Sequence, residues 1–144
     1  MEDLYHPRIL ELAANIPHVG RLDQPDGAAT KVSRICGSVV TVELKLKDGF
    51  ISDIAVHPKA CALGQAATGV LAMNAIGATP QEIRAARDGL HAMLKDGADP
   101  PAGRFWELRH LQGVADYPPR HTSTMLAFDA AVEAMEQAKV KAKL

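Results

Sequence analysis

Apolar and polar residues alternate most regularly in the second quarter of the chain. From Val40 to Lys47 every even-numbered residue is apolar and every odd-numbered residue is polar, and the apolar Val39 precedes this run. A two-residue period of this kind is typical of a half-buried strand. Asp48-Gly49 follows and suits a tight turn, because glycine tolerates a positive φ. The alternation resumes from Phe50 to Val56. The sequence therefore predicts an antiparallel hairpin of two strands.

Helical patterns occupy much of the remaining chain. Pro7 to Ala14 predicts a short helix that ends before Pro17. Residues 62–76 are rich in Ala, Leu, Val and Met on nearly every side, which predicts a buried helix ending at Gly77. Residues 79–82, Thr-Pro-Gln-Glu, form the capping box of a further helix.

The other segments complete a mixed architecture. Residues 17–35 have no sustained period and predict a long irregular segment, and residues 96–103 predict a polar loop. A short helix is expected over 104–112, a break at 117–119 and a final helix over 122–138, with a frayed end from Lys139 to Leu144. Helices that follow a hairpin in this way predict an α+β fold, with helices packed on one face of a small antiparallel sheet.

Composition narrows the class of protein. The 144 residues are 47% hydrophobic and 23% charged, with a formal net charge of −1, which predicts one folded domain spanning residues 1–144. That charge balance argues against nucleic acid or a membrane surface as partner. No apolar run approaches the roughly 20 residues needed to span a bilayer, and the acidic start lacks the features of a signal peptide. We expect a soluble, cytoplasmic protein.

The candidate chemistry lies at three junctions between these elements. Two cysteines are too few for a disulfide framework, so each is a buried apolar residue, a metal ligand or a reactive thiol. Cys36 lies where the irregular segment enters the first strand, and Cys61 opens the buried helix, whose N-terminus favours a thiolate. His121 precedes the last helix, where Thr122 or Ser123 is expected to act as an ordinary N-cap. Spacing alone predicts only a thiol site.

Three segments carry a family resemblance. Residues 34–38, Arg-Ile-Cys-Gly-Ser, lead into a strand, residues 54–63 lead from a strand through Cys61 into a helix, and residues 117–128 read Tyr-Pro-Pro-Arg-His-Thr-Ser-Thr-Met-Leu-Ala-Phe. In this order they resemble the iron–sulfur cluster assembly scaffolds of the IscU/SufU type, the NifU N-terminal domain family. The stretch from about Lys95 to Gly113 looks like the insertion of the SufU-like branch.

The resemblance implies a site with a reduced set of ligands. The family uses three cysteines and an aspartate, and the matching positions here are Cys36, Ser38, Cys61 and Ser123. His121, two residues before Ser123, is the expected additional metal ligand beside Cys36 and Cys61, and His57 is a weaker candidate. A serine hydroxyl is a poor replacement for a thiolate.

The function implied by the resemblance is that of a non-enzymatic scaffold or sulfur acceptor. It would receive sulfur from a cysteine desulfurase, with Cys61 as the expected acceptor and Cys36 as co-ligand. A labile iron–sulfur cluster shared between two chains of a homodimer would obtain two thiolates from each. Two alternatives remain open: a divergent binding module that has lost its metal chemistry and holds no metal, and a zinc-binding protein that uses Cys36, Cys61 and His121.

Overall fold

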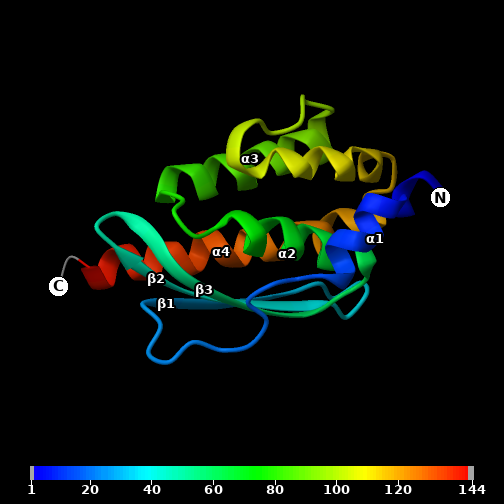
Figure 1. Ribbon diagram of the computed structural model, residues 1–144. Coiled ribbons are helices and arrows are strands. Elements are labelled where there is room, and N and C mark those ends of the chain that lie inside the picture. The colour runs from blue at the N-terminus through cyan, green and yellow to red at the C-terminus, as the bar shows by residue number, and fades with distance from the viewer. Residues whose placement is uncertain (1, 143–144) are drawn as a thin grey trace.

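The computed structural model describes residues 2–142 and has the predicted α+β architecture. Helices cover one face of a three-stranded antiparallel sheet (Figure 1). Along the chain the elements are η1 (Glu2–Tyr5), α1 (Pro7–Ala14), β1 (Gly27–Val32), β2 (Val39–Lys47), β3 (Phe50–Lys59), α2 (Ala62–Asn74), α3 (Pro80–Asp96), η2 (Gly103–Asp116), η3 (Pro118–Arg120) and α4 (His121–Ala142). Within residues 2–142 no helix combines the length and the apolar character needed to cross a membrane.

The predicted hairpin is confirmed as β2 and β3. The sheet order is β1-β2-β3, and Val42 at its centre pairs with Ala29 of β1 and with Val56 of β3. β3 continues to Lys59, three residues beyond the predicted end. The sheet therefore reaches almost to Cys61, and α2 begins directly after that residue.

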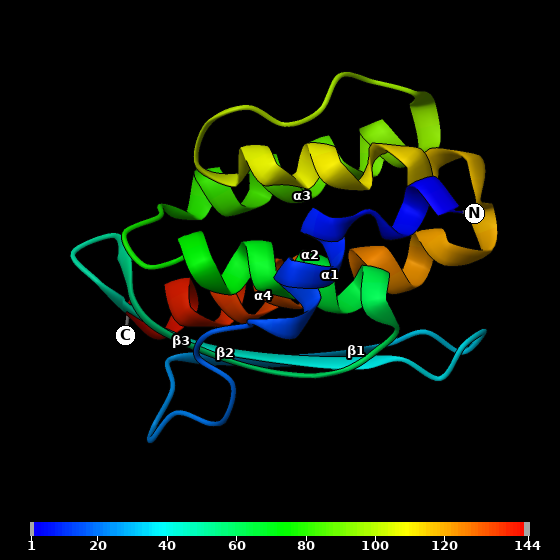
Figure 2. The same cartoon turned by 45° about the vertical axis from the view of Figure 1, so that its right-hand side comes forward.

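The prediction of an irregular segment over residues 17–35 is wrong for β1. Glycine and alanine have low strand propensity, so Gly27-Ala28-Ala29 gave no strand signal. These small residues are needed because α4 lies close over the strand: a Cβ atom on Gly27 would collide with the carbonyl of Ala134. Residues 17–26 do form a loop, which lies on the side of the sheet away from the helices (Figure 2).

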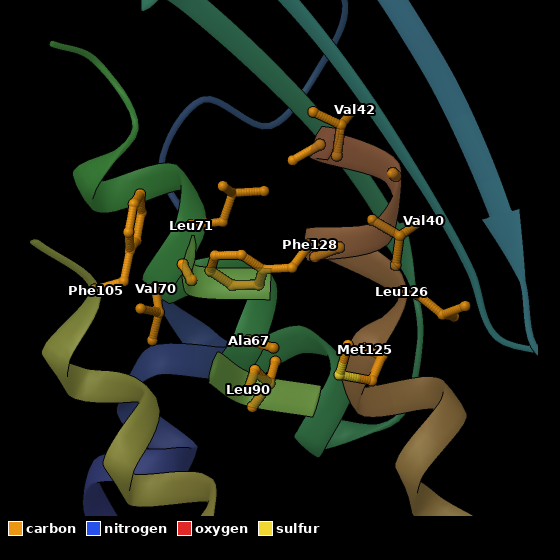
Figure 3. Close-up of a cluster of buried hydrophobic side chains, with 14 of the residues drawn as sticks. Val40, Val42, Ala67, Val70, Leu71, Leu90, Phe105, Met125, Leu126 and Phe128 are labelled. Atoms are coloured by element: carbon orange, nitrogen blue, oxygen red, sulfur yellow. The ribbon is translucent and has the colours of Figure 1, made fainter. Parts of the chain in front are cut away.

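The core lies between the sheet and two helices, α2 and α4. The Phe128 ring sits at its centre, close to Leu71, and meets the Phe105 ring of η2 edge-on at 5.5 Å between centroids (Figure 3). The predicted buried helix is confirmed as α2, which ends at Asn74. The apolar residues on nearly all its sides face α1, α4 and η2.

Two helical predictions need correction near the C-terminus. The short helix expected over 104–112 is the longer 3₁₀ segment η2. α4 begins at His121, so Thr122 and Ser123 lie inside the helix, and neither is its N-cap. The helix continues through Ala142, past the expected fraying at Lys139, and the last two residues lie outside the described part.

Polar contacts fix the outer layer of helices. The capping box of α3 is confirmed: Thr79 Oγ1 accepts from the Glu82 backbone N–H at 3.2 Å, and Glu82 Oε1 accepts from the Thr79 N–H at 3.1 Å. At the start of α1, Arg8 donates two hydrogen bonds to the Glu107 carboxylate of η2, at 2.8 and 2.9 Å. Because Glu107 is buried, this pair anchors α1 to η2.

Candidate functional site

The loop between β1 and β2 presents Cys36 at one end of the sheet. Ser33 donates its backbone N–H to the Ser38 carbonyl at 2.8 Å, and Gly37 donates its own to the Ser33 carbonyl at 2.8 Å. Gly37 has a φ of 72°, a conformation that glycine adopts without steric cost. Figure 2 shows the loop at one end of the sheet, and the Cys36 side chain is exposed.

Hydroxyl groups surround the Cys36 sulfur. Its Sγ lies 3.4 Å from Ser33 Oγ and 3.1 Å from Ser38 Oγ. Hydrogen bonds from Ser33, then from the Ser38 hydroxyl, lower the pKa of Cys36 from its ordinary 9.0 to about 7. Burial opposes this shift, whereas the Ser38 backbone N–H and the Ser123 hydroxyl add to it. Donors stabilise the charged form of the thiol, so Cys36 is largely a thiolate above neutral pH.

Cys61 approaches the same place from the other side. It is the N-cap residue of α2, half-buried, and its thiol donates to Ser123 Oγ at 3.7 Å. Gly64, one turn into α2, permits this approach, because a Cβ there would lie 2.9 Å from the Ser123 carbonyl oxygen. The sequence therefore brings α2 and α4 into backbone contact beside the thiol.

Ser123 links the two cysteines. It is fully buried, its hydroxyl lies 3.1 Å from the Arg120 carbonyl, and hydrogen bonding to this hydroxyl contributes to the lowered pKa of Cys36. Cys36, Ser38, Cys61 and Ser123 thus come together from the β1–β2 loop, the start of α2 and the start of α4. These are the four positions that the family resemblance selected.

The two candidate histidines are not part of this group. The His121 ring is buried, and its Nε2 lies 2.9 Å from the Val114 carbonyl and 3.2 Å from that of Ala115, while its Nδ1 is buried without a partner in the described part. Residues 2–142 contain no group of three His, Cys, Asp or Glu side chains arranged to hold a metal ion. His57 lies at an exposed position of β3. We therefore do not retain either histidine in the ligand set.

One contributing residue was missed by sequence reasoning. Ser33 lies three residues before Cys36, where irregular chain was expected, and its contact with the thiol exists only because the loop turns back on itself. A Ser-x-x-Cys spacing before a glycine was the available signal.

Basic and exposed apolar residues flank the site residues in the chain. The nearest charged residue in the sequence is Arg34 for Cys36, Lys59 for Cys61 and Arg120 for Ser123. Ile35 is 73% exposed and Val32 53% exposed, both on the arm that carries Cys36. Such a surface suits contact with an apolar, acidic surface of another protein.

Comparison with known proteins identifies the class to which this fold and site belong. Residues 4–99 match the model of the NifU-like N terminal domain, and the chain belongs to this family. This confirms the resemblance drawn from the three motifs.

Two curated relatives extend the match over nearly the whole chain. The iron-sulfur cluster assembly scaffold protein IscU of Streptococcus pyogenes is 26% identical over 137 residues, which is 95% of this chain and 86% of the relative. The IscU of Thermotoga maritima is 24% identical over 93% of this chain and 94% of the relative.

Solved structures agree on the fold. The N-terminal NifU-like protein of Brucella abortus superposes with a TM-score of 0.95 at 48% identity, covering 97% of each chain. The FiSufU protein of the thermophile Fervidobacterium islandicum has a TM-score of 0.84 at 21% identity over 92% of this chain and 96% of its own. This second likeness concerns the fold alone. The insertion expected near 95–113 is not tested by these matches and stays a prediction.

Proposed function

We propose that this protein is an iron–sulfur cluster assembly scaffold that accepts sulfur from a cysteine desulfurase. The observation that carries the proposal is the meeting of two cysteines at Ser123, in a chain related to proteins named as IscU scaffolds. It acts as a carrier in the cytoplasm, with no catalytic turnover of its own.

Cys36 is the better-placed sulfur acceptor. The sequence favoured Cys61 for this role, but Cys61 is half-buried, whereas Cys36 is exposed and hydrogen bonding to Ser33 and Ser38 lowers its pKa to about 7. The Cys36 thiolate attacks the outer sulfur of a persulfide on the desulfurase. The donor S–S bond breaks, the donor cysteine leaves as a thiolate, and Cys36 becomes the persulfide.

The ligand set suits a cluster shared between two chains. A cluster is ordinarily held by four thiolates, and one chain supplies Cys36 and Cys61 only. Ser38 and Ser123 supply neutral hydroxyls, which bind iron far less well than thiolates. Two chains that face each other through this site would supply four thiolates, and the cluster, as cargo, would be readily released.

Zinc as a resident metal fits the site poorly. A closed zinc site needs four ligands of the thiolate, imidazole or carboxylate type, and the two thiols of one chain have only hydroxyls beside them. Nothing in the proposed function depends on zinc.

Sulfur transfer from a desulfurase tests the proposal directly. The protein is incubated with a cysteine desulfurase and cysteine, and its intact mass is followed. We expect a gain of one sulfur atom in the wild type and in Cys61→Ala, and none in Cys36→Ala. Thr122→Ala, an exposed change beside Ser123, is the matched control and should behave as wild type. Transfer that survives in Cys36→Ala and is lost in Cys61→Ala would restore Cys61 as acceptor.

Cluster assembly is tested separately. Iron and sulfide are supplied without oxygen, and metal content, absorption and molecular mass are measured for the wild type and for the Cys36→Ala/Cys61→Ala double variant. The proposal expects a visible charge-transfer band and a dimer in the wild type only. Absence of both cluster and sulfur transfer in the wild type would indicate a binding module that has lost scaffold chemistry.

A further inference from the structure

A second polar site lies where α1 begins and η2 passes over it. Its cavity of about 550 Å³ is lined by His6, Pro100, Arg109, His110, Gln112 and Gly113. Among residues 4–141, whose side chains the structure describes, the lining contains no carboxylate and neither cysteine. One cation and several polar groups therefore face a hollow that the cysteine chemistry does not use.

Arg109 is held with its terminal nitrogens free. Its guanidinium lies over the Trp106 ring, 5.2 Å from the centroid, and its Nε donates to the Trp106 carbonyl at 3.2 Å. Within residues 4–141, whose side chains the structure describes, Nη1 and Nη2 of Arg109 make no hydrogen bond or ion pair. Stacking on Trp106 fixes the plane of the guanidinium. The N–H groups of Nη1 and Nη2 remain available to donate to a ligand.

Two histidines line the cavity beside Arg109. The His6 and His110 rings meet edge-on with centroids 5.5 Å apart, and His6 Nε2 lies 3.4 Å from the His110 carbonyl. His110 Nε2 lies 3.6 Å from Glu107 Oε1, so both Nδ1 atoms stay without a partner in the described part of the chain. Burial lowers the pKa of His110, which keeps this ring neutral near pH 7.

Glu107 does not cancel the charge of Arg109, because its carboxylate is already bound by Arg8 through two hydrogen bonds. The Gln112 amide is exposed and has no hydrogen bond within residues 2–142. The free polar groups around the cavity thus include the fixed guanidinium of Arg109 and an amide, and no carboxylate of residues 4–141 lines the cavity.

We propose that this cavity binds a small oxyanion, the phosphate or carboxylate group of a small molecule, with Arg109 as its main contact. A guanidinium matches the oxygens of either group in a two-point hydrogen bond, and the amide N–H of Gln112 supplies a further contact. The proposal is independent of the proposed function.

Trp106, the single tryptophan of the chain, reports on this site because Arg109 stacks on it. Sodium phosphate and sodium succinate are titrated separately at constant ionic strength, and tryptophan fluorescence and binding heat are both followed. We expect saturable binding of at least one of the two, weakened about ten- to hundredfold in Arg109→Gln. A response to phosphate alone would show that the ligand carries a phosphate group, and a response to succinate alone would show that it carries a carboxylate.

Two controls make the result decisive. Arg34→Gln removes the same charge from the exposed β1–β2 loop and should bind as wild type. The Cys36→Ala/Cys61→Ala variant should also bind as wild type, so this test stays separate from that of the sulfur site. Absence of saturable binding for both anions, or equal binding in Arg109→Gln, would overturn the proposal.

Discussion

The thiol of Cys61 lies 3.7 Å from the hydroxyl oxygen of Ser123, although 62 positions separate the two residues in the chain. The same hydroxyl contributes to the lowered pKa of Cys36. A serine therefore occupies the point at which a third thiolate would complete a compact metal-binding group.

Ser123→Cys should convert the site into a stronger metal site. The new sulfur would replace a neutral hydroxyl beside Cys61 and add a third thiolate, so we expect zinc or cobalt to bind at least about tenfold more tightly. Cobalt titration followed by its charge-transfer absorption measures this. Thr122→Cys adds a thiol at the exposed neighbouring position and should leave the affinity unchanged. Equal affinities in both variants would contradict the geometry.

Cys36 should react as a thiol with a pKa near 7. In the Cys61→Ala background, where Cys36 is the only thiol, the alkylation rate should reach half its maximum at a pH of about 7 instead of the ordinary 9.0. Loss of the hydroxyl in Ser33→Ala or Ser38→Ala should raise that midpoint, because the thiolate loses a donor. Ser52→Ala, on the exposed part of β3, is the control. A midpoint that is the same in all four proteins would contradict the role of the hydroxyls.

The residues around the two thiols show which parts of the site could be predicted from the sequence. Four of the five residues around the thiols, Cys36, Ser38, Cys61 and Ser123, were selected by family resemblance, because short motifs fix these positions in the chain. Ser33 was missed, and the ring of the predicted ligand His121 turns to backbone carbonyls, because ring and hydroxyl directions depend on the local backbone. His121 follows the 3₁₀ turn of η3, which directs its ring to the carbonyls of η2.

Gly27→Ala should be strongly destabilising. The added methyl would overlap the Ala134 carbonyl of α4, and both partners are backbone in regular elements that cannot easily move apart. We expect a loss of about 2–4 kcal/mol in the free energy of unfolding, measured by urea denaturation. Gly113→Ala, whose methyl would find Leu4 Cδ2 at 3.5 Å, is the control and should change stability by less than about 1 kcal/mol.

This close approach explains why the hairpin was predictable and β1 was not. β2 and β3 carry their own alternating pattern, since one face of each is covered by large side chains of the core. β1 is shaped by α4, more than 100 residues later in the chain, and that contact requires small residues with little strand propensity.

Acid should weaken the anchoring of α1 to η2. Hydrogen bonds from Arg8 lower the pKa of the buried Glu107 carboxylate below its ordinary 4.5, so the pair contributes its full stabilisation above that pH. The contribution is lost as the pH falls from about 4.5 through the lowered pKa of Glu107. Arg8→Ala should lower the free energy of unfolding at pH 7 and flatten this part of the acid dependence, because the Glu107 carboxylate loses its two donors.

Thermal unfolding at closely spaced pH values compares Arg8→Ala with the wild type. Lys47→Ala, an exposed change at the end of β2, is the control for the loss of one positive charge. Equal acid dependence in the wild type and Arg8→Ala would show that the pair does not couple protonation to stability.

The contact between Gly27 and Ala134 also bears on synthesis of the protein. The strand that leads into the Cys36 loop is held by a helix that is made about 100 residues later, and that same helix carries Ser123. While the ribosome is still translating α4, β1 lacks the partner that covers its inner face, and the Cys36 thiol lacks one of its hydroxyl donors. A nascent chain can therefore expose both cysteines before their surroundings exist, and the site acquires its final reactivity only after α4 has left the ribosome and has docked.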